Sequence, residues 1–203
     1  MKVIGLAGGI GAGKSSVSSR LRDREAAIVD GDIVARELQE PGEPVFTQMV
    51  ATFGDGIVAP DGRLDRQAVA DIVFSDLTEL ARLTAITTPA IEAEIHARIL
   101  EHAGSDDVVV VDAALIQVRH QYGEQATIVV DVDPELAVER LVLHRGMSEA
   151  DARNRIANQQ SRAERLAIAD FVIDNNGTAD DLDDQVAKAW AWIESLPPWA
   201  PES

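Results

Sequence analysis

Short apolar runs alternate with longer amphipathic stretches along most of the chain, a pattern typical of strands alternating with helices. The apolar run at 108–111 and the mostly apolar runs at 3–7 and 127–132 predict buried strands, and shorter runs at 26–29 and 171–173 predict two more. Because apolar residues occupy consecutive positions in these runs, both faces of each strand must be covered. The sequence therefore predicts an α/β fold with a parallel sheet flanked by helices.

The remaining periodic segments predict helices, and turn residues mark several of their ends. The expected helices are 13–22, 33–39, 44–53, 134–144, 148–166 and a terminal helix ending near 195. From 65 to 102 the pattern is mostly helical, with an interruption expected at Pro89. The tail from Pro197 cannot continue the last helix, and we expect it to be loose. With no internal repeat or low-complexity linker, residues 1–203 are predicted to form one domain.

Composition narrows the possible chemistry. The chain contains no cysteine, and its four histidines show no zinc-ligand spacing. Acidic residues outnumber basic ones 35 to 18, which gives a formal charge of −17 and disfavours nucleic acid or an anionic membrane as partner. No segment resembles a targeting signal or a membrane span, so we expect a cytoplasmic protein, monomeric or weakly homo-oligomeric, that acts on a small molecule.

The segment from Gly8 to Ser15 fits the P-loop pattern G-x-x-x-x-G-K-[ST] at every required position. It follows a predicted strand and opens a predicted helix, so its backbone N–H groups can surround the phosphates of ATP. An ordinary glycine-rich turn is the alternative, and the glycine spacing does not give the dinucleotide fingerprint. The predicted nucleotide-binding residues of this segment are Gly8, Gly9, Ile10, Gly11, Ala12, Gly13, Lys14, Ser15 and Ser16.

Carboxylates follow two of the predicted strands, where ligands of parallel sheets bind. Asp32 is the candidate general base for an attacking hydroxyl, with Asp30 second; Asp32 could instead cap the helix expected from Ile33. Asp112 ends the strand 108–111, in a position that suits magnesium, or it is a strand-end carboxylate without a ligand. The predicted metal ligands are Ser15, Asp32 and Asp112.

Arginines cluster between 140 and 165, and a helical lid carrying them could close over ATP. The alternative is a set of solvated helix faces on which arginines pair with neighbouring acids. We expect that alternative for most of them, namely Arg153, Arg155, Arg162 and Arg165. Arg140 and Arg145 are the stronger candidates for phosphate contact.

Taken together, the motifs resemble the dephospho-coenzyme A kinase family, in the expected order over nearly the whole chain. The matching residues are Ile4–Ser15, Val29–Asp32 with Ala35–Glu37, Phe53-Gly54, Asp61-Gly62 with Leu64-Asp65, Arg145–Met147, Arg155-Ile156 with Gln159, and Ala169-Asp170 with Ile173–Asn175 and Gly177.

The resemblance implies a kinase that transfers the γ-phosphate of ATP, with magnesium, to the ribose 3′-hydroxyl of dephospho-CoA. It implies that Asp32 accepts the proton, that Lys14 and Arg140 steady the phosphates, and that Asn175 and Gly177 lie near adenine. It also implies a core at about 1–60, 105–115, 127–133 and 167–196, acceptor-binding helices at about 60–104, and a lid at about 115–165.

Two segments depart from the family pattern on the acceptor side. Thr88-Pro89 stands where the family usually has His-Pro, and Ala114-Leu115-Ile116 followed by Val118 stands where it has Pro-Leu-Leu and a glutamate. A kinase with another acceptor, or an ATP-binding relative without catalysis, therefore stays open. A regulatory GTPase is disfavoured because the chain has no Asn-Lys pair for guanine recognition.

Overall fold

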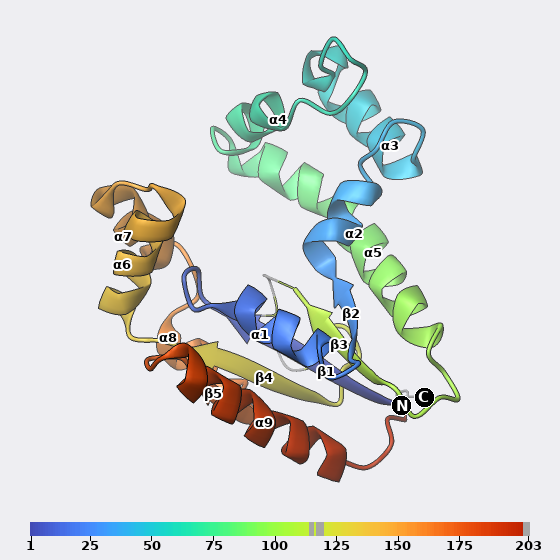
Figure 1. Cartoon of the computed structure of the whole chain (residues 1–203). Helices are drawn as coiled ribbons and strands as arrows, with labels where there is room; N and C mark the ends of the chain where they lie inside the picture. The colour runs from blue at the N-terminus through green and yellow to red at the C-terminus, as the bar shows by residue number, and fades with distance from the viewer. Residues whose placement is uncertain (114–115, 117–119, 201–203) are drawn as a thin grey trace. The chain divides into compact units, whose positions relative to one another are not determined.

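The computed structural model describes residues 1–113, 116 and 120–200. The chain divides into two compact units. The first combines Met1–Asp30 with Ile99–Ser203, and the second is Gly31–Arg98. The first unit contains the sheet, and the second is a group of helices (Figure 1).

A parallel sheet forms the centre of the first unit and confirms the predicted fold class. Its strands are β1 (Lys2–Gly8), β2 (Ala27–Asp30), β3 (Val108–Asp112), β4 (Ala126–Asp131) and β5 (Phe171–Asp174). They lie in the order β2-β3-β1-β4-β5, and every neighbouring pair is parallel. All of β3 and most of β1 and β4 are buried, as consecutive apolar residues require.

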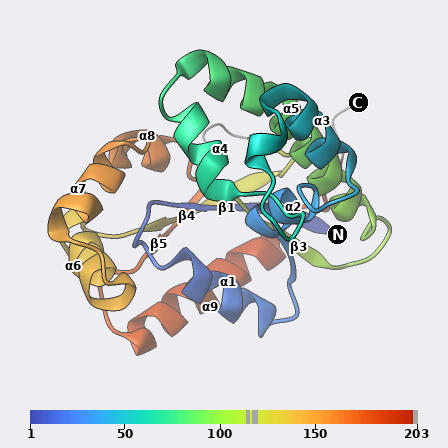
Figure 2. The same cartoon turned by 90° about the horizontal axis from the view of Figure 1, so that it is seen from above.

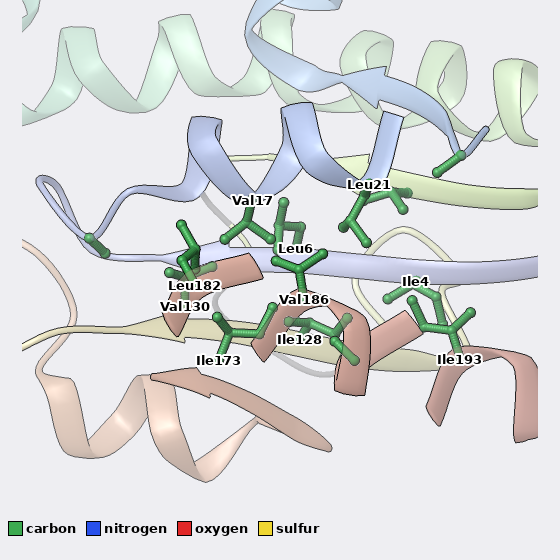
Figure 3. Close-up of a cluster of buried hydrophobic side chains, with 14 of the residues drawn as sticks. Ile4, Leu6, Val17, Leu21, Ile128, Val130, Ile173, Leu182, Val186 and Ile193 are labelled. Atoms are coloured by element: carbon green, nitrogen blue, oxygen red, sulfur yellow. The ribbon is translucent and has the colours of Figure 1, made fainter. Parts of the chain in front are cut away.

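Helices α1 (Lys14–Arg22) and α9 (Ala179–Ser195) cover one face of this sheet. Ile4 and Leu6 of β1 alternate on that face and pack beneath Val17 and Leu21 of α1, as Figure 3 shows. Val186 of α9 lies in the same cluster, among side chains from β4 and β5. This core fixes where β1 ends and where α1 begins, and so it fixes the loop between them.

Helices α6 (Pro134–Arg145), α7 (Glu149–Ala157) and α8 (Arg162–Ala167) gather at one end of the sheet in both views (Figures 1 and 2). Asp133 caps α6, and Gly146, with φ of 63°, ends it. The prediction of one helix over 148–166 is wrong, because the helix is interrupted between α7 and α8. A capping box starts α8 afresh: the Ser161 hydroxyl accepts from the Glu164 N–H, and the Glu164 carboxylate accepts from the Ser161 N–H.

The second unit consists of helices around its own apolar cluster. They are α2 (Gly31–Glu37), α3 (Pro44–Phe53), the short 3₁₀ helix η1 (Asp55–Ile57), α4 (Arg66–Val73) and α5 (Leu77–Leu100), of which Ile99 and Leu100 are assigned to the first unit. The interruption predicted at Pro89 is wrong, since α5 runs through it. Ile86 and Ala90, on either side of the proline, pack on the same cluster, and this packing holds both halves of the helix together.

Trp199 ties the tail to the N-terminal residue and to the loop before β4. The Trp199 N–H donates to the Met1 carbonyl at 2.9 Å, and its indole N–H donates to the Gly123 carbonyl at 2.7 Å. The tail expected to be loose is therefore tied down as far as Trp199, and its last residues, 201–203, lie outside the described part of the chain. None of the described helices is long and apolar enough to cross a membrane.

Candidate active site

The loop between β1 and α1 has the backbone of a phosphate cradle. Gly11 and Gly13 adopt positive φ angles of 79° and 89°, in the region where glycine is favoured, and Gly13 is the N-cap of α1. A Cβ on Gly11 would lie 2.9 Å from the Ala137 carbonyl oxygen of α6, and one on Gly13 would overlap the amide of Asn175. The sequence motif thus uses glycine where conformation and close packing both demand it.

Lys14 forms an ion pair with Asp112 beside this loop. Asp112 is the last residue of β3 and is 6% exposed, so the sheet and its covering helices hold the carboxylate in place. Asp30 is its register partner at the end of β2. The structure therefore brings together, at the carboxyl edge of the sheet, the lysine and the acidic strand end that the motif singled out. Ion pairs that are largely buried often add little to the free energy of unfolding, and charged groups held in this way are typical of functional sites.

Asn175 supports the cradle from behind. Its side chain is 6% exposed, and its amide Nδ2 donates to the carbonyl oxygen of Ala12 at 2.7 Å. Its backbone N–H donates to the Asp131 carbonyl of β4, and its own carbonyl accepts from Nη2 of Arg140 at 2.9 Å. A continuous set of hydrogen bonds therefore joins α6, the end of β5 and the P-loop.

Arg140 keeps one donor uncommitted in this arrangement. Its Nη1 is buried and has no hydrogen-bond partner among the described residues. A buried donor without a partner costs free energy, which makes this atom a candidate contact for an anionic ligand. The bond of Nη2 to the Asn175 carbonyl fixes the guanidinium near the cradle.

Sequence reasoning gave Gln159 no role and assigned Arg165 to a solvated helix face, but the structure places both beside the P-loop. The Ile10 N–H of the P-loop donates to Oε1 of Gln159 at 2.9 Å. The Arg165 guanidinium lies against Gly9, with Nη2 2.9 Å from where a Cβ would stand, and Nη1 donates to the Gln160 carbonyl. Burial lowers the pKa of Arg165. The Ser161-x-x-Glu164 pattern is the sequence signal for the interruption between the two helices, and this interruption places both residues beside the P-loop.

The Gln159 and Arg165 side chains, together with Gly9, Ile10 and Asp131, line a small open cleft next to the cradle. Arg162 also faces it and binds the Asp131 carboxylate through two hydrogen bonds, of 2.8 and 2.6 Å, which raise the pKa of the guanidinium. A P-loop with an adjacent lysine–aspartate pair and arginines can hold a polyphosphate and stabilise charge that develops on it.

Comparison with known proteins decides the family. The family model described as dephospho-CoA kinase matches residues 2–181. The chain belongs to this family. A dephospho-CoA kinase of Thermobifida fusca is 45% identical over 196 residues, covering 96% of this chain and 97% of the relative. One of Leifsonia xyli is 43% identical, covering 95% of this chain and 99% of the relative. The resemblance inferred from the motifs is confirmed.

Solved structures share the fold of this chain. A Thermus thermophilus structure is 27% identical, with a TM-score of 0.80, and covers 97% of this chain and 98% of that one. A dephospho-CoA kinase from Campylobacter jejuni, 20% identical, has a TM-score of 0.66 and covers 95% and 97%. A shikimate kinase from Bacteroides thetaiotaomicron, 14% identical with a TM-score of 0.54 and coverage of 95% and 98%, shares the fold.

The remaining predicted site residues fall in different places. Ser15 and Ser16 are exposed in the first turn of α1, and Arg145 is exposed in the last turn of α6. Gly177 precedes α9, and a Cβ there would crowd the Asp181 carboxylate that caps the helix. Its glycine thus has a structural reason beside any contact with adenine.

Asp32 and Arg153 allow two of the alternative interpretations to be checked. Helix α2 begins at Gly31, so Asp32 is an exposed residue of its first turn rather than the cap of a helix starting at Ile33. Arg153 pairs with Glu135 and Glu149, which raises its pKa and agrees with a solvated face. No group of three metal-ligating His, Cys, Asp or Glu side chains occurs within the described residues.

Proposed function

We propose that this chain transfers the γ-phosphoryl group of ATP to the ribose 3′-hydroxyl of dephospho-CoA, giving coenzyme A and ADP. The observation that carries the proposal is the match to the dephospho-CoA kinase family over residues 2–181, with relatives aligned along almost their whole length. The geometry of the P-loop supports the ATP half of the reaction.

The cradle binds the phosphates through the backbone N–H groups at the start of α1, with the glycine-rich loop before it curving around them, and through the positive end of that helix. Lys14, next to this loop, takes the β- and γ-phosphates, and Arg140 uses the buried Nη1 toward the same substrate. Arg145, Asn175, Gly177 and Ser16 complete the proposed nucleotide site. The segment 115–165 acts as a lid over it.

Magnesium fits the oxygen donors of this edge of the sheet. Mg²⁺ in kinases is held by one or two protein oxygens together with substrate phosphates, and the Ser15 hydroxyl and the Asp112 carboxylate supply such donors. We propose these two residues and Asp32 as its ligands. When bound, the ion neutralises charge on the transferring phosphoryl group. Because Lys14 pairs with Asp112, the same lysine also orients that carboxylate.

Asp32 is the proposed proton acceptor. It is an exposed carboxylate, two residues after the end of β2. As the 3′-oxygen bonds to the γ-phosphorus, the bond from that phosphorus to the β–γ bridging oxygen breaks, and the hydroxyl proton passes to Asp32. A positioned general base of this kind contributes about 10²–10⁴ in rate. ADP leaves with the bridging oxygen, and Lys14 stabilises the charge on it.

We propose that the helices within residues 60–104, most of which belong to the second unit, bind the acceptor. Thr88, which departs from the family pattern, lies half-buried in α5. The other departure, Ala114–Val118, falls outside the described residues except for Ile116, which is 3% exposed. An altered acceptor is the second candidate, because both departures belong to this half.

The test is ADP release from ATP·Mg²⁺ by the purified chain, with and without dephospho-CoA. We expect strong stimulation by the acceptor, about 10²–10⁴-fold lower kcat in Asp32→Asn, and a loss of about 10²–10³ in Lys14→Ala. Asp184→Asn, which removes an exposed carboxylate from α9, serves as the matched control and stays at the wild-type rate. ATP binding without stimulation by dephospho-CoA would reject this acceptor, and a panel of other ribose hydroxyls would then follow.

A further inference from the structure

The helix is interrupted between α7 and α8, and one polar side chain of this interruption, which we call the break, contacts the P-loop. Residues 158–161 leave the helical path, with Asn158 closing α7 and the Ser161 capping box opening α8. Gln159 lies in the middle of this break, and its Oε1 accepts from the Ile10 N–H at 2.9 Å. The break therefore has a consequence for the cradle itself.

Ile10 lies in the part of the loop between the sheet and α1, where its side chain packs against Val138, Leu141 and Ala152. Gly8 still pairs within the sheet, and residues from Gly13 onward join α1. Between them, the Ala12 N–H donates to the Gly9 carbonyl at 3.0 Å, and Gly9 to Gly11 form the tip of the loop. Backbone N–H groups bind phosphate only when they are already oriented, so the position of this tip matters for ATP.

Arg165 contacts the same tip at the neighbouring residue. Its guanidinium packs directly on Gly9, and it is kept there by a hydrogen bond to the Gln160 carbonyl, within the same break. Gln159 and Arg165 thus reach the two adjacent residues Gly9 and Ile10 from one short segment. Both side chains line the cleft next to the cradle.

We propose that Gln159 is a positioning residue, which sets the tip of the phosphate cradle for ATP by accepting the Ile10 N–H. It couples the α7–α8 segment to the P-loop, so movement of that segment changes how well the cradle fits the nucleotide. A neutral acceptor is suited to this task, since a carboxylate there would repel the phosphates. The proposal rests on the proposed kinase function, whose ATP site it refines.

Three variants test it. Gln159→Met keeps the length and bulk of the side chain but removes the acceptor, and one net hydrogen bond corresponds to about a three- to tenfold loss of kcat/KM for ATP. Gln159→Glu keeps an acceptor but adds charge, so ATP affinity falls further, by more than about tenfold. Asn158→Ala is the matched control, since it removes an exposed amide that makes no side-chain hydrogen bond within the described part of the chain.

The kinetic signature separates positioning from a merely structural role. We expect the KM for dephospho-CoA and the Tm of Gln159→Met to stay near wild type while kcat/KM for ATP falls, and Asn158→Ala to match wild type in all three. Equal ATP parameters for Gln159→Met and Asn158→Ala would overturn the proposal. So would wild-type ATP affinity in Gln159→Glu, or a lower Tm without a kinetic effect.

Binding of a non-hydrolysable ATP analogue distinguishes the failure of this proposal from failure of the proposed function. If the wild-type chain binds the analogue but releases no ADP with dephospho-CoA, the proposed acceptor is wrong. The order of affinities, wild type and Asn158→Ala above Gln159→Met above Gln159→Glu, would then still support Gln159 as a positioning residue, and any other order would refute it.

Discussion

Replacing Asn175 with alanine should destabilise the P-loop, because it removes the side-chain hydrogen bond to the loop backbone. The buried amide donates to the Ala12 carbonyl, and Ala12 is itself only 2% exposed. The variant leaves this carbonyl oxygen without its donor in a place that water does not reach. An unsatisfied buried acceptor costs about 1–3 kcal/mol. We therefore expect the free energy of unfolding to fall by about 2 kcal/mol, which lowers Tm by about 4–8 °C for a chain of this size.

The measurement is thermal unfolding with and without ATP·Mg²⁺, together with titration of ATP binding. We expect both a lower Tm and weaker ATP binding for Asn175→Ala, because the same hydrogen bond shapes the cradle. Asn154→Ala is the matched control, since it removes an exposed amide from α7. A decrease in Tm of less than about 2 °C, together with unchanged ATP affinity, would refute the reasoning.

Asn175→Asp adds a dependence on pH whose sign follows from burial. A carboxylate would face the Ala12 carbonyl and repel it, whereas the protonated acid can donate as the amide does. Burial raises the pKa of such an acid above its unfolded value of about 3.9. The stability is then fully present below the unfolded pKa and is lost as pH rises through the folded pKa. Asn175→Asp should approach wild type near pH 5 and fall to or below Asn175→Ala at pH 8, and a pH-independent Tm difference would contradict this.

Three further predictions concern other parts of the first unit. Gly13→Ala should abolish ATP binding in equilibrium titrations, because φ is 89° and the Cβ would overlap Asn175. Glu124→Gln should raise Tm at pH 8 but not at pH 5, because burial raises the pKa of this 1% exposed carboxyl, so its contribution to stability is lost as pH rises through the folded pKa. Trp199→Phe should lower the free energy of unfolding by about 1 kcal/mol, measured by urea denaturation, since it removes the indole hydrogen bond to the Gly123 carbonyl.

Local signals predicted most of the first unit. The runs of consecutive apolar residues located each strand to within a residue or two, since burial on both faces leaves little choice of residue. The cap at Asp133 and the stop at Gly146 were visible because helix ends need particular side chains and φ angles. The P-loop was readable for the same reason, because its glycines meet a backbone demand that hardly any other residue satisfies.

Interactions between distant residues were not readable in this way. Periodicity over 148–166 is helical on both sides of the break, and only the capping box at Ser161 identifies it. Pro89 was expected to end a helix, but packing of the two halves on one cluster outweighs the lost hydrogen bond. The Asn175 side chain reaches Ala12 across 163 positions of sequence. A resemblance could associate Asn175 with the nucleotide, but it could not reveal that the amide holds the P-loop itself.

The net charge of −17 raises the question of how this chain holds a polyanion, and the site answers it locally. Two carboxylates near the cradle are already neutralised, Asp112 by Lys14 and Asp131 by Arg162. Arg140 and Arg165, by contrast, hydrogen-bond to carbonyl oxygens and form no salt bridge with the described acidic side chains. Their charges are therefore left for the nucleotide, whereas distant surface acids are screened beyond a Debye length of about 8 Å at physiological salt. Local pairing, not the overall balance of charge, decides the sign of the field that ATP meets.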